Sequence, residues 1–213
     1  MEFRTKVELP VKGPKLHHSD KLMIWGSCFS EHIGNLLMEN KFTCDMNPFG
    51  VLYNPLSIAT SMRCLLEGTC YEPKDLRHTD GTWYSLMHHS CFSAASQEEC
   101  LGKINERIRK GHANLLQADW ILITWGSSFV YTWKENGAIV GNCHKLPARL
   151  FDRRMVSAEE IAAAYIPLLQ QLHTLRPNLQ CLFTVSPIRH LKDGLHGNQL
   201  SKANLLLATD KIC

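Results

Sequence analysis

Three apolar segments of the chain have the pattern of strands that are buried on both faces. They run over residues 21–26, 120–126 and 179–187, and within them apolar residues do not alternate cleanly with polar ones. Parallel strands covered by helices have this pattern, because both of their faces lie against apolar side chains. A shorter segment at 42–44 is a candidate for a fourth strand.

Helical patterns with clear start signals separate these segments. The starts are marked by N-cap or capping-box pairs, namely Asn54–Pro55, Ser96–Glu99 and Ser157–Glu160. Gly68 is placed to end the first of these helices, and the pattern over 201–210 predicts a last one. Strands that alternate with helices predict a three-layer α/β fold with a mainly parallel sheet, formed as one domain over residues 1–213.

One β-hairpin interrupts this alternation. Residues 130–133 and 138–140 are rich in β-branched and aromatic side chains, and they flank Asn136-Gly137. Asn-Gly is favoured in tight hairpin turns because both residues tolerate positive φ. We therefore expect a hairpin at the end of the strand over 120–126.

Composition places the chain among ordinary globular proteins. Of its 213 residues, 45% are hydrophobic and 20% are charged, which excludes disordered and fibrous classes. The formal net charge of +3 is too small to indicate a nucleic-acid partner or a charged membrane surface. No apolar run reaches the roughly 18–20 residues that a bilayer span requires, and the first ten residues lack the apolar core of a signal peptide.

The cysteines indicate a reducing compartment. The chain has nine of them, an odd number, and they are scattered without a C-x-x-C pair. Reduced thiols in a cytoplasmic protein are the simplest interpretation, and the spacing of histidines and cysteines predicts no metal site. No Gly-x-Gly-x-x-Gly or phosphate loop is present, so no cofactor is expected.

Candidate chemistry follows the carboxyl ends of the predicted strands, where open α/β sheets bind their ligands. The loops at these ends carry Cys28, Gly50, Ser127 and His190, and we expect all four to open on one edge of the sheet. Cys28 and its neighbour Ser27 precede a predicted helix, whose free amides and dipole favour a thiolate or a developing oxyanion. In the alternative interpretation, Ser27 only caps this helix and Cys28 is a small buried side chain.

Several blocks of the sequence resemble one known family. Gly26-Ser27-Cys28-Phe29-Ser30 resembles the eponymous motif of the GSCFA-domain family, with Ser30 where that family usually has alanine. Further blocks that resemble the family follow in the same order at 49–55, 89–93, 142–147 and 185–190. The family is grouped with the SGNH/GDSL hydrolases, so the resemblance implies a flavodoxin-like sheet, a serine nucleophile, a histidine base and usually an aspartate.

Carrying these roles over leaves two candidate nucleophiles. The position of the SGNH nucleophile is occupied by Cys28 and that of the preceding aspartate by Ser27, so either Cys28 reacts or the turn is shifted and Ser27 reacts. The resemblance implies oxyanion donors at the Gly50 amide and at Ser127–Ser128. There Ser128 stands where the hydrolases have an asparagine.

Two blocks supply candidate substrate contacts. Asn142 and His144 are neighbours in one block, and Arg189 and His190 in another. An arginine beside a histidine at this edge suits an anionic or oxygen-rich substrate. In the alternative interpretation these histidines hold the surrounding loops by hydrogen bonds.

The Asp-x-x-His pair of the hydrolases is absent from its usual place. The resemblance implies a further strand and helix that end in this pair, and the sequence stops at Cys213, so we expect this C-terminal part to be missing. Asp193 and His196 match the spacing locally, although Gly194 between them is more typical of a loop.

These observations favour an SGNH-type hydrolase that acts covalently on an ester bond, with an acylated carbohydrate as the substrate class suggested by analogy. The alternative is a non-catalytic ligand-binding module that keeps the fold and the cleft. Either way the expected partner is a small molecule or a carbohydrate ester, and neither nucleic acid nor a membrane is expected. The oligomeric state does not follow from the sequence.

Overall fold

A parallel sheet of four strands forms the centre of the computed structural model, which describes residues 13–213. The strands are β1 (Lys21–Trp25), β2 (Thr43–Met46), β5 (Trp120–Trp125) and β9 (Gln180–Val185). Their order is β2-β1-β5-β9, and every neighbouring pair is parallel. This is the beginning of the flavodoxin-like strand order. The strands β1, β5 and β9 were predicted from the three apolar segments, and β2 overlaps the candidate strand at 42–44. The expectation that the first ten residues are not a signal peptide concerns residues outside the described part.

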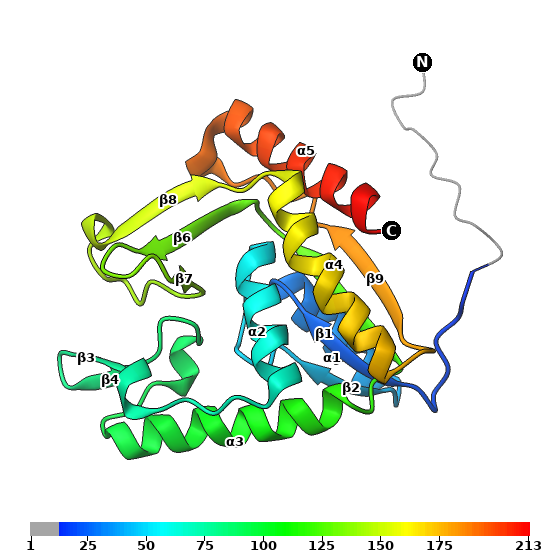
Figure 1. Ribbon diagram of the computed structural model, residues 1–213, viewed down its shortest axis with the longest axis horizontal. Helices are drawn as coiled ribbons and strands as arrows, with labels where there is room; N and C mark the ends of the chain where they lie inside the picture. The colour runs from blue at the N-terminus through cyan, green and yellow to red at the C-terminus, as the bar shows by residue number, and fades with distance from the viewer. Residues whose placement is uncertain (1–12) are drawn as a thin grey trace.

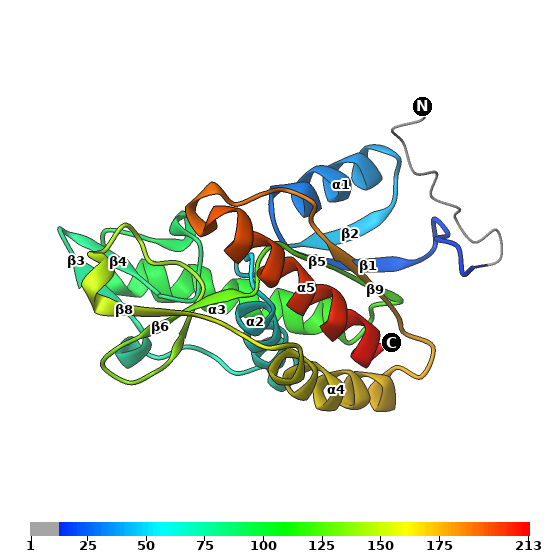
Figure 2. The same cartoon turned by 90° about the horizontal axis from the view of Figure 1, so that it is seen from above.

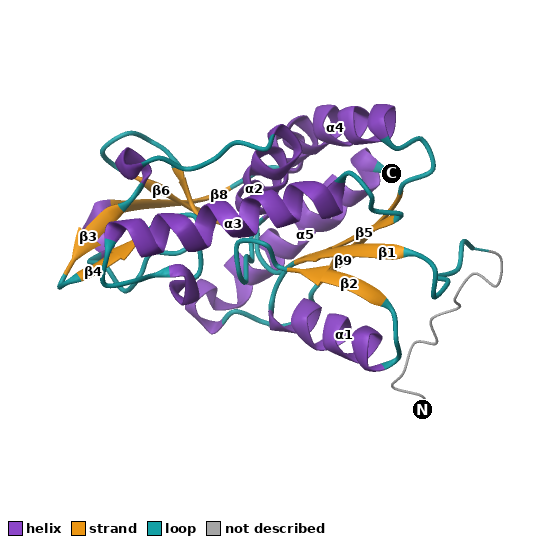
Figure 3. Cartoon of the chain, turned by 90° about the horizontal axis from the view of Figure 1, so that it is seen from below, coloured by secondary structure: helices purple, strands orange, loops and turns teal. Residues whose placement is uncertain are grey.

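Helices cover both faces of this sheet, which makes the three predicted layers (Figures 2 and 3). The helix α1 (Cys28–Glu39) lies on one face. The other face is covered by α2 (Pro55–Glu67), α3 (Gln97–Leu115) and α4 (Ala158–Leu175). The last helix, α5 (Gly194–Ile212), packs along α4 and β9.

The predicted helix starts are confirmed by their N-cap hydrogen bonds. The side chains of Asn54, Ser96 and Ser157 each accept a hydrogen bond from a backbone amide in the first turn of α2, α3 and α4. Gly68 ends α2 in the left-handed conformation with φ of 65°. These caps satisfy backbone groups that a helix end leaves free, so the local sequence is sufficient to define where these helices begin.

A second, antiparallel sheet projects from the carboxyl end of β5 (Figure 1). It consists of β6 (Phe129–Trp133), β7 (Ile139–Val140) and β8 (Phe151–Met155), in the order β7-β6-β8. The predicted hairpin is confirmed by the pairing of β6 with β7. The strand β8 was not predicted, because its three central residues are charged or polar and exposed, as suits an edge strand.

Short elements complete the chain. A hairpin of β3 (Arg77–Thr79) and β4 (Thr82–Tyr84) precedes α3. Four 3₁₀ helices lie in the loops at Pro73–Asp75, Ser90–Phe92, Ala148–Leu150 and Leu191–Asp193. None of the helices in the described range is long and apolar enough to cross a bilayer.

The main core lies between the sheet and the α2–α4 layer. Trp125 and Tyr165 are both fully buried there, and the Trp125 indole donates a hydrogen bond to the Tyr165 hydroxyl at 3.1 Å. That hydroxyl in turn donates to the carbonyl of Pro55 at 3.0 Å. This contact joins β5, α4 and the start of α2, and its hydrogen bonds offset the loss of water from the two buried polar groups.

Candidate functional site

The four strand-end loops open on one edge of the sheet, as predicted, and hydrogen bonds join them to one another. The Gly26 amide donates to the Asn47 side chain at 2.9 Å, which links the loops after β1 and β2. The Gly126 amide donates to the Tyr53 carbonyl at 2.8 Å, and the His190 imidazole bonds to the Gly126 carbonyl at 3.2 Å. The loops that carry Cys28, Gly50, Ser127 and His190 therefore form one connected surface.

A cleft of about 610 Å³ lies between this edge and the antiparallel sheet. Tyr53, Ser127 and His190 line it from the edge of the central sheet. Phe129, Tyr131 and Arg153 line it from β6 and β8, and Asn142 and Asp193 complete the wall. Its volume is in the range of small-molecule sites, roughly 300–1,000 Å³, so we take it as the candidate active site.

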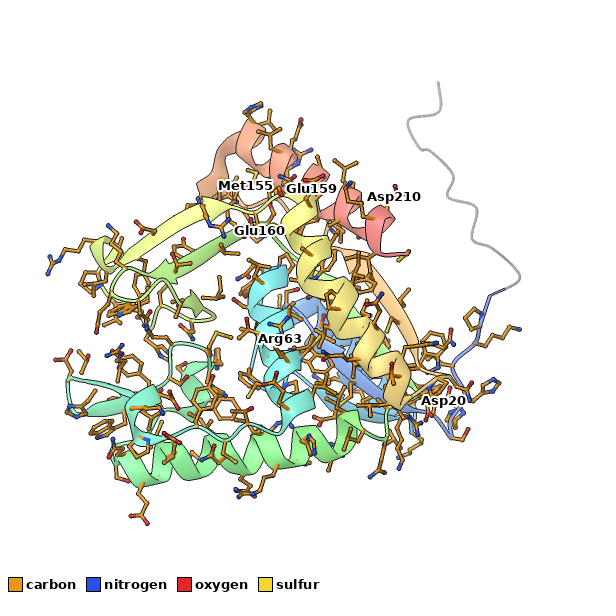
Figure 4. The ribbon with its side chains drawn as sticks, viewed as in Figure 1. Asp20, Arg63, Met155, Glu159, Glu160 and Asp210 are labelled. Carbon is orange, nitrogen blue, oxygen red and sulfur yellow. The ribbon has the colours of Figure 1, made fainter. Side chains whose placement is uncertain are left out.

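A second cavity, of about 420 Å³, lies between α2 and the two hairpins. It is lined by Arg63, which Figure 4 labels on α2, and by residues of the β3–β4 and β6–β7 hairpins. None of the candidate site residues lines this cavity, so it lies apart from the candidate chemistry.

The structure separates the roles of Ser27 and Cys28. Ser27 is buried, and its hydroxyl accepts a hydrogen bond from the Phe29 amide at 3.3 Å, which makes it the N-cap of α1. Cys28 is the first residue of α1 and is exposed. The idea that Cys28 is a small buried side chain is wrong, and of the two candidate nucleophiles only Cys28 is accessible and free of a capping role.

Tyr53 lines the cleft, whereas Cys28 does not. Burial raises the pKa of the Tyr53 phenol, and negative charge on nearby Cys28 and Glu31 raises it further. On its other side the Tyr53 ring lies edge-on to the His190 ring, with centroids 6.5 Å apart. Since β5 separates β1 from β9, Cys28 and His190 follow strands about 10 Å apart. A bound ligand would have to bridge them.

The predicted oxyanion donors are occupied by contacts within the protein. The Gly50 amide donates to the Asn47 carbonyl at 2.7 Å, so it is not free to bind a ligand. Ser128 is fully buried, and its hydroxyl donates to Ser201 of α5 at 3.1 Å. Ser127 does line the cleft, but its hydroxyl already accepts from the Phe129 amide at 3.1 Å. The oxyanion assignment of Gly50 and Ser128 is therefore corrected, because α5 and the turn after β2 take up these groups.

Asn142 and His144 are separated by the fold. Asn142 lines the cleft, while its side-chain oxygen accepts from the His144 amide at 2.9 Å. The His144 ring turns away, bonds to the Ser85 carbonyl at 2.8 Å and packs on Tyr84. Burial lowers the pKa of His144, so its ring is held neutral in a structural role. His144 is therefore not a substrate contact in this arrangement.

Arg189 and His190 are also separated. His190 lines the cleft, and its amide donates to the Asn198 side chain at 3.1 Å, which fixes the loop against α5. Arg189 is exposed and does not line the cleft. Of the expected arginine–histidine pair, His190 alone therefore lines the cleft.

Asp193 and His196 do not form an acid–base pair. The expected loop between them is instead the end of a 3₁₀ helix and the first turn of α5. The Asp193 side chain is only 2% exposed and forms an ion pair with Arg153, whereas His196 is exposed on α5. This pairing makes Asp193 a partner of a cleft arginine.

Among the cleft residues that sequence reasoning missed, Arg153 and Lys192 are the arginine and the lysine. The Arg153 guanidinium lies 3.8 Å from the centroid of the Phe129 ring, and the Lys192 ammonium lies 2.9 Å from the Tyr131 hydroxyl. No sequence signal pointed to Arg153, because β8 itself was not predicted. Lys192 adjoins the 185–190 block, which was the one available indication. Within residues 13–213, no group of three or more metal-ligating side chains is placed to hold an ion.

Together these features define an α/β protein with an open, doubly wound parallel sheet, an accessible cysteine at the start of its first helix, and a cleft at the carboxyl edge. Residues 21–213 match the model of the GSCFA family, which covers nearly all of the chain. The chain therefore belongs to the GSCFA family. No curated protein and no solved structure matches it.

Proposed function

We propose that this chain is a cysteine-dependent hydrolase of small esters, with Cys28 as the nucleophile and the cleft as the substrate site. The observation that carries the proposal is the exposed thiol at the first position of α1, whose charge reaches the cleft residue Tyr53, with Ser27 occupied as the cap. The resemblance of the sequence blocks supports an SGNH-like ancestry as part of this proposal, and the scattered cysteines support a cytoplasmic location. An acylated carbohydrate is the substrate class that the analogy favours.

The chemistry would proceed through a thioester. The Cys28 sulfur attacks the ester carbonyl, a carbon–sulfur bond forms, the carbon–oxygen bond to the alcohol breaks, and the alcohol leaves with a proton. Water then attacks the thioester, which releases the acid and restores the thiol. The Phe29 amide is bonded to Ser27, and the positive end of the α1 dipole favours the negative charge that develops on the carbonyl oxygen.

The acyl intermediate itself is the sharpest test of this proposal. After incubation with p-nitrophenyl acetate, intact-mass and peptide analysis should find one acetyl group, located on Cys28. A Cys28→Ala variant should lack it, and a Ser27→Ala variant, which loses about 1 kcal/mol of capping, should retain it. Acetylation of Ser27, or of surface residues alone, would overturn the assignment.

The second candidate function is a ligand-binding module without catalysis. It is favoured by one observation, that the Gly50 amide and the Ser128 hydroxyl are both engaged within the protein. In that case ligands bind in the cleft, while no acetyl group accumulates on Cys28 and ester hydrolysis does not exceed that of buffer.

A further inference from the structure

We propose that the cleft binds a ligand that carries an anionic group, a phosphate or a carboxylate, seated on Arg153 and Lys192. This deepens the proposed function by naming the class of substrate, and it rests on the same cleft.

Arg153 is held in a fixed orientation. Its guanidinium stacks on Phe129 at 3.8 Å from the ring centroid and forms an ion pair with the buried Asp193 carboxylate. The contact with Asp193 uses one of its terminal nitrogens, while a guanidinium has five N–H donors in a rigid fork. An arginine oriented by an aromatic face and a carboxylate has donors left to hold an anion in two-point contact.

Lys192 extends the same wall. Its ammonium lies 2.9 Å from the Tyr131 hydroxyl and 5.5 Å from the centre of that ring, so Tyr131 positions it over the cleft. Cys143 also lines the cleft, and burial raises the pKa of its thiol. The charge of nearby Lys192 acts in the opposite direction and lowers that pKa. Arg153 and Lys192 therefore stand on one side of the cleft, on neighbouring aromatic rings of β6.

The wall carries an excess of positive charge. Among the described residues that line the cleft, Asp193 is the one carboxylate, and its charge is taken up by Arg153. Lys192 is left as a net cation among these lining residues. Cations gathered in a cleft with low-dielectric walls raise the local concentration of anions, which gives this wall a preference for anionic ligands.

Cys28 lies toward the other end of this arrangement. Cys28 does not itself line the cleft, but its charge reaches Tyr53, which lines the cleft at the sheet edge. Arg153 lies on β8, and Lys192, from the 3₁₀ helix after β9, is held against Tyr131 of β6. An acylated sugar phosphate or an acylated sugar acid would place its anionic group on Arg153 and Lys192 and its ester near Cys28. The anion would thus orient the substrate without taking part in the bond changes.

Calorimetric titration of the wild-type protein with glucose 6-phosphate, glucuronate and glucose tests this inference. We expect the first two to bind and glucose to bind at least tenfold more weakly. The relative affinities of glucose 6-phosphate and glucuronate tell a phosphate site from a carboxylate site. Equal affinity for glucose and the anionic sugars would overturn the proposal.

Variants make the test specific to the wall. Lys192→Gln should weaken the anionic ligands about tenfold, which corresponds to about 1.4 kcal/mol. Arg153→Lys keeps a cation for Asp193 but loses the forked donors of the guanidinium. This variant should weaken the binding of the anionic ligands by a similar factor. The matched control is Lys134→Gln, which removes the same charge from an exposed position of the β6–β7 turn. Unchanged affinity in both Lys192→Gln and Arg153→Lys, or an equal loss in Lys134→Gln, would contradict the proposal.

The two proposals fail in distinguishable ways. Cys28→Ala should bind glucose 6-phosphate as the wild type does, because Cys28 does not hold the anion. Acetylation of Cys28 without binding of anionic sugars overturns the anion site alone. Binding without acetylation overturns the hydrolase and leaves the anion site in place.

Discussion

Replacing Gly26 by alanine should destabilise the turn that presents Cys28. Gly26 has a φ of +146°, a conformation that L side chains rarely adopt, and it stands between the end of β1 and the cap of α1. A methyl group at this position would lie 2.6 Å from the Thr124 carbonyl oxygen and would overlap the Ser30 hydroxyl. The turn therefore requires glycine both for its backbone conformation and for the space beside β5.

The size of the effect follows from three contributions. Holding alanine at this φ costs about 1–3 kcal/mol. Pressing the methyl group against a backbone oxygen of β5, which is fixed by the sheet, costs about 1–3 kcal/mol. The Ser30 hydroxyl can rotate away only by giving up its hydrogen bond to the Trp25 carbonyl, at about 1 kcal/mol. The expected loss in the free energy of unfolding is thus about 3–7 kcal/mol, a large part of the stability of an ordinary domain.

Urea denaturation followed by tryptophan fluorescence measures this loss, with iodoacetamide labelling of Cys28 as a second readout. The matched control is Gly102→Ala in α3, where no atom lies within 4 Å of the added methyl group. That control should gain about 0.5–1 kcal/mol, because alanine is the better helix residue. If Gly26→Ala unfolds at the same urea concentration as the wild type, this account of the turn is refuted.

Three further predictions follow. Iodoacetamide at mildly alkaline pH should modify Cys28 well before Cys64, because burial raises the pKa of Cys64 to about 12; equal rates by peptide mapping would contradict this. Arg107→Ala should cost about 2–4 kcal/mol in urea denaturation, since it leaves the nearly buried Asp45 carboxylate without its cation; a loss below about 0.5 kcal/mol would show a solvated pair. Burial lowers the pKa of His88 to about 3 from 6.5, so the unfolded chain binds a proton that the folded chain excludes. The contribution of neutral His88 to the free energy of unfolding is therefore full above pH 6.5 and is lost as the pH falls toward 3. The melting temperature of His88→Phe should fall less than that of the wild type over this range, and an equal fall in both proteins would argue against this role of His88.

Most of the central fold was predictable from short-range patterns. The strands β1, β5 and β9 were visible as apolar segments, because a strand buried on both faces has few polar residues. The caps at Asn54, Ser96 and Ser157 were visible because their side chains bond to amides only a few residues away. The strand β8 was not visible, since an exposed edge strand needs no apolar pattern and its pairing with β6 is a long-range contact.

The candidate site was predictable only in part. Its location followed from the parallel arrangement, which brings the carboxyl ends of all four strands to one edge, and Cys28 and His190 do lie there. The directions of individual side chains did not follow. The Ser128 hydroxyl bonds to Ser201, which is 73 residues away in the chain, and the His144 ring bonds to the Ser85 carbonyl, 59 residues away.

The sequence by itself determined the layered α/β fold and the helix starts, because each depends on local propensity, burial or a contact within a few residues. Only the tertiary structure decided which candidate groups are free. Polar side chains at a sheet edge have several partners within reach, and packing against α5 and the antiparallel sheet selects among them. For the same reason the pairing of Arg153 with Asp193, and with it the charge of the cleft, depends on two segments 40 residues apart that meet only in the folded chain.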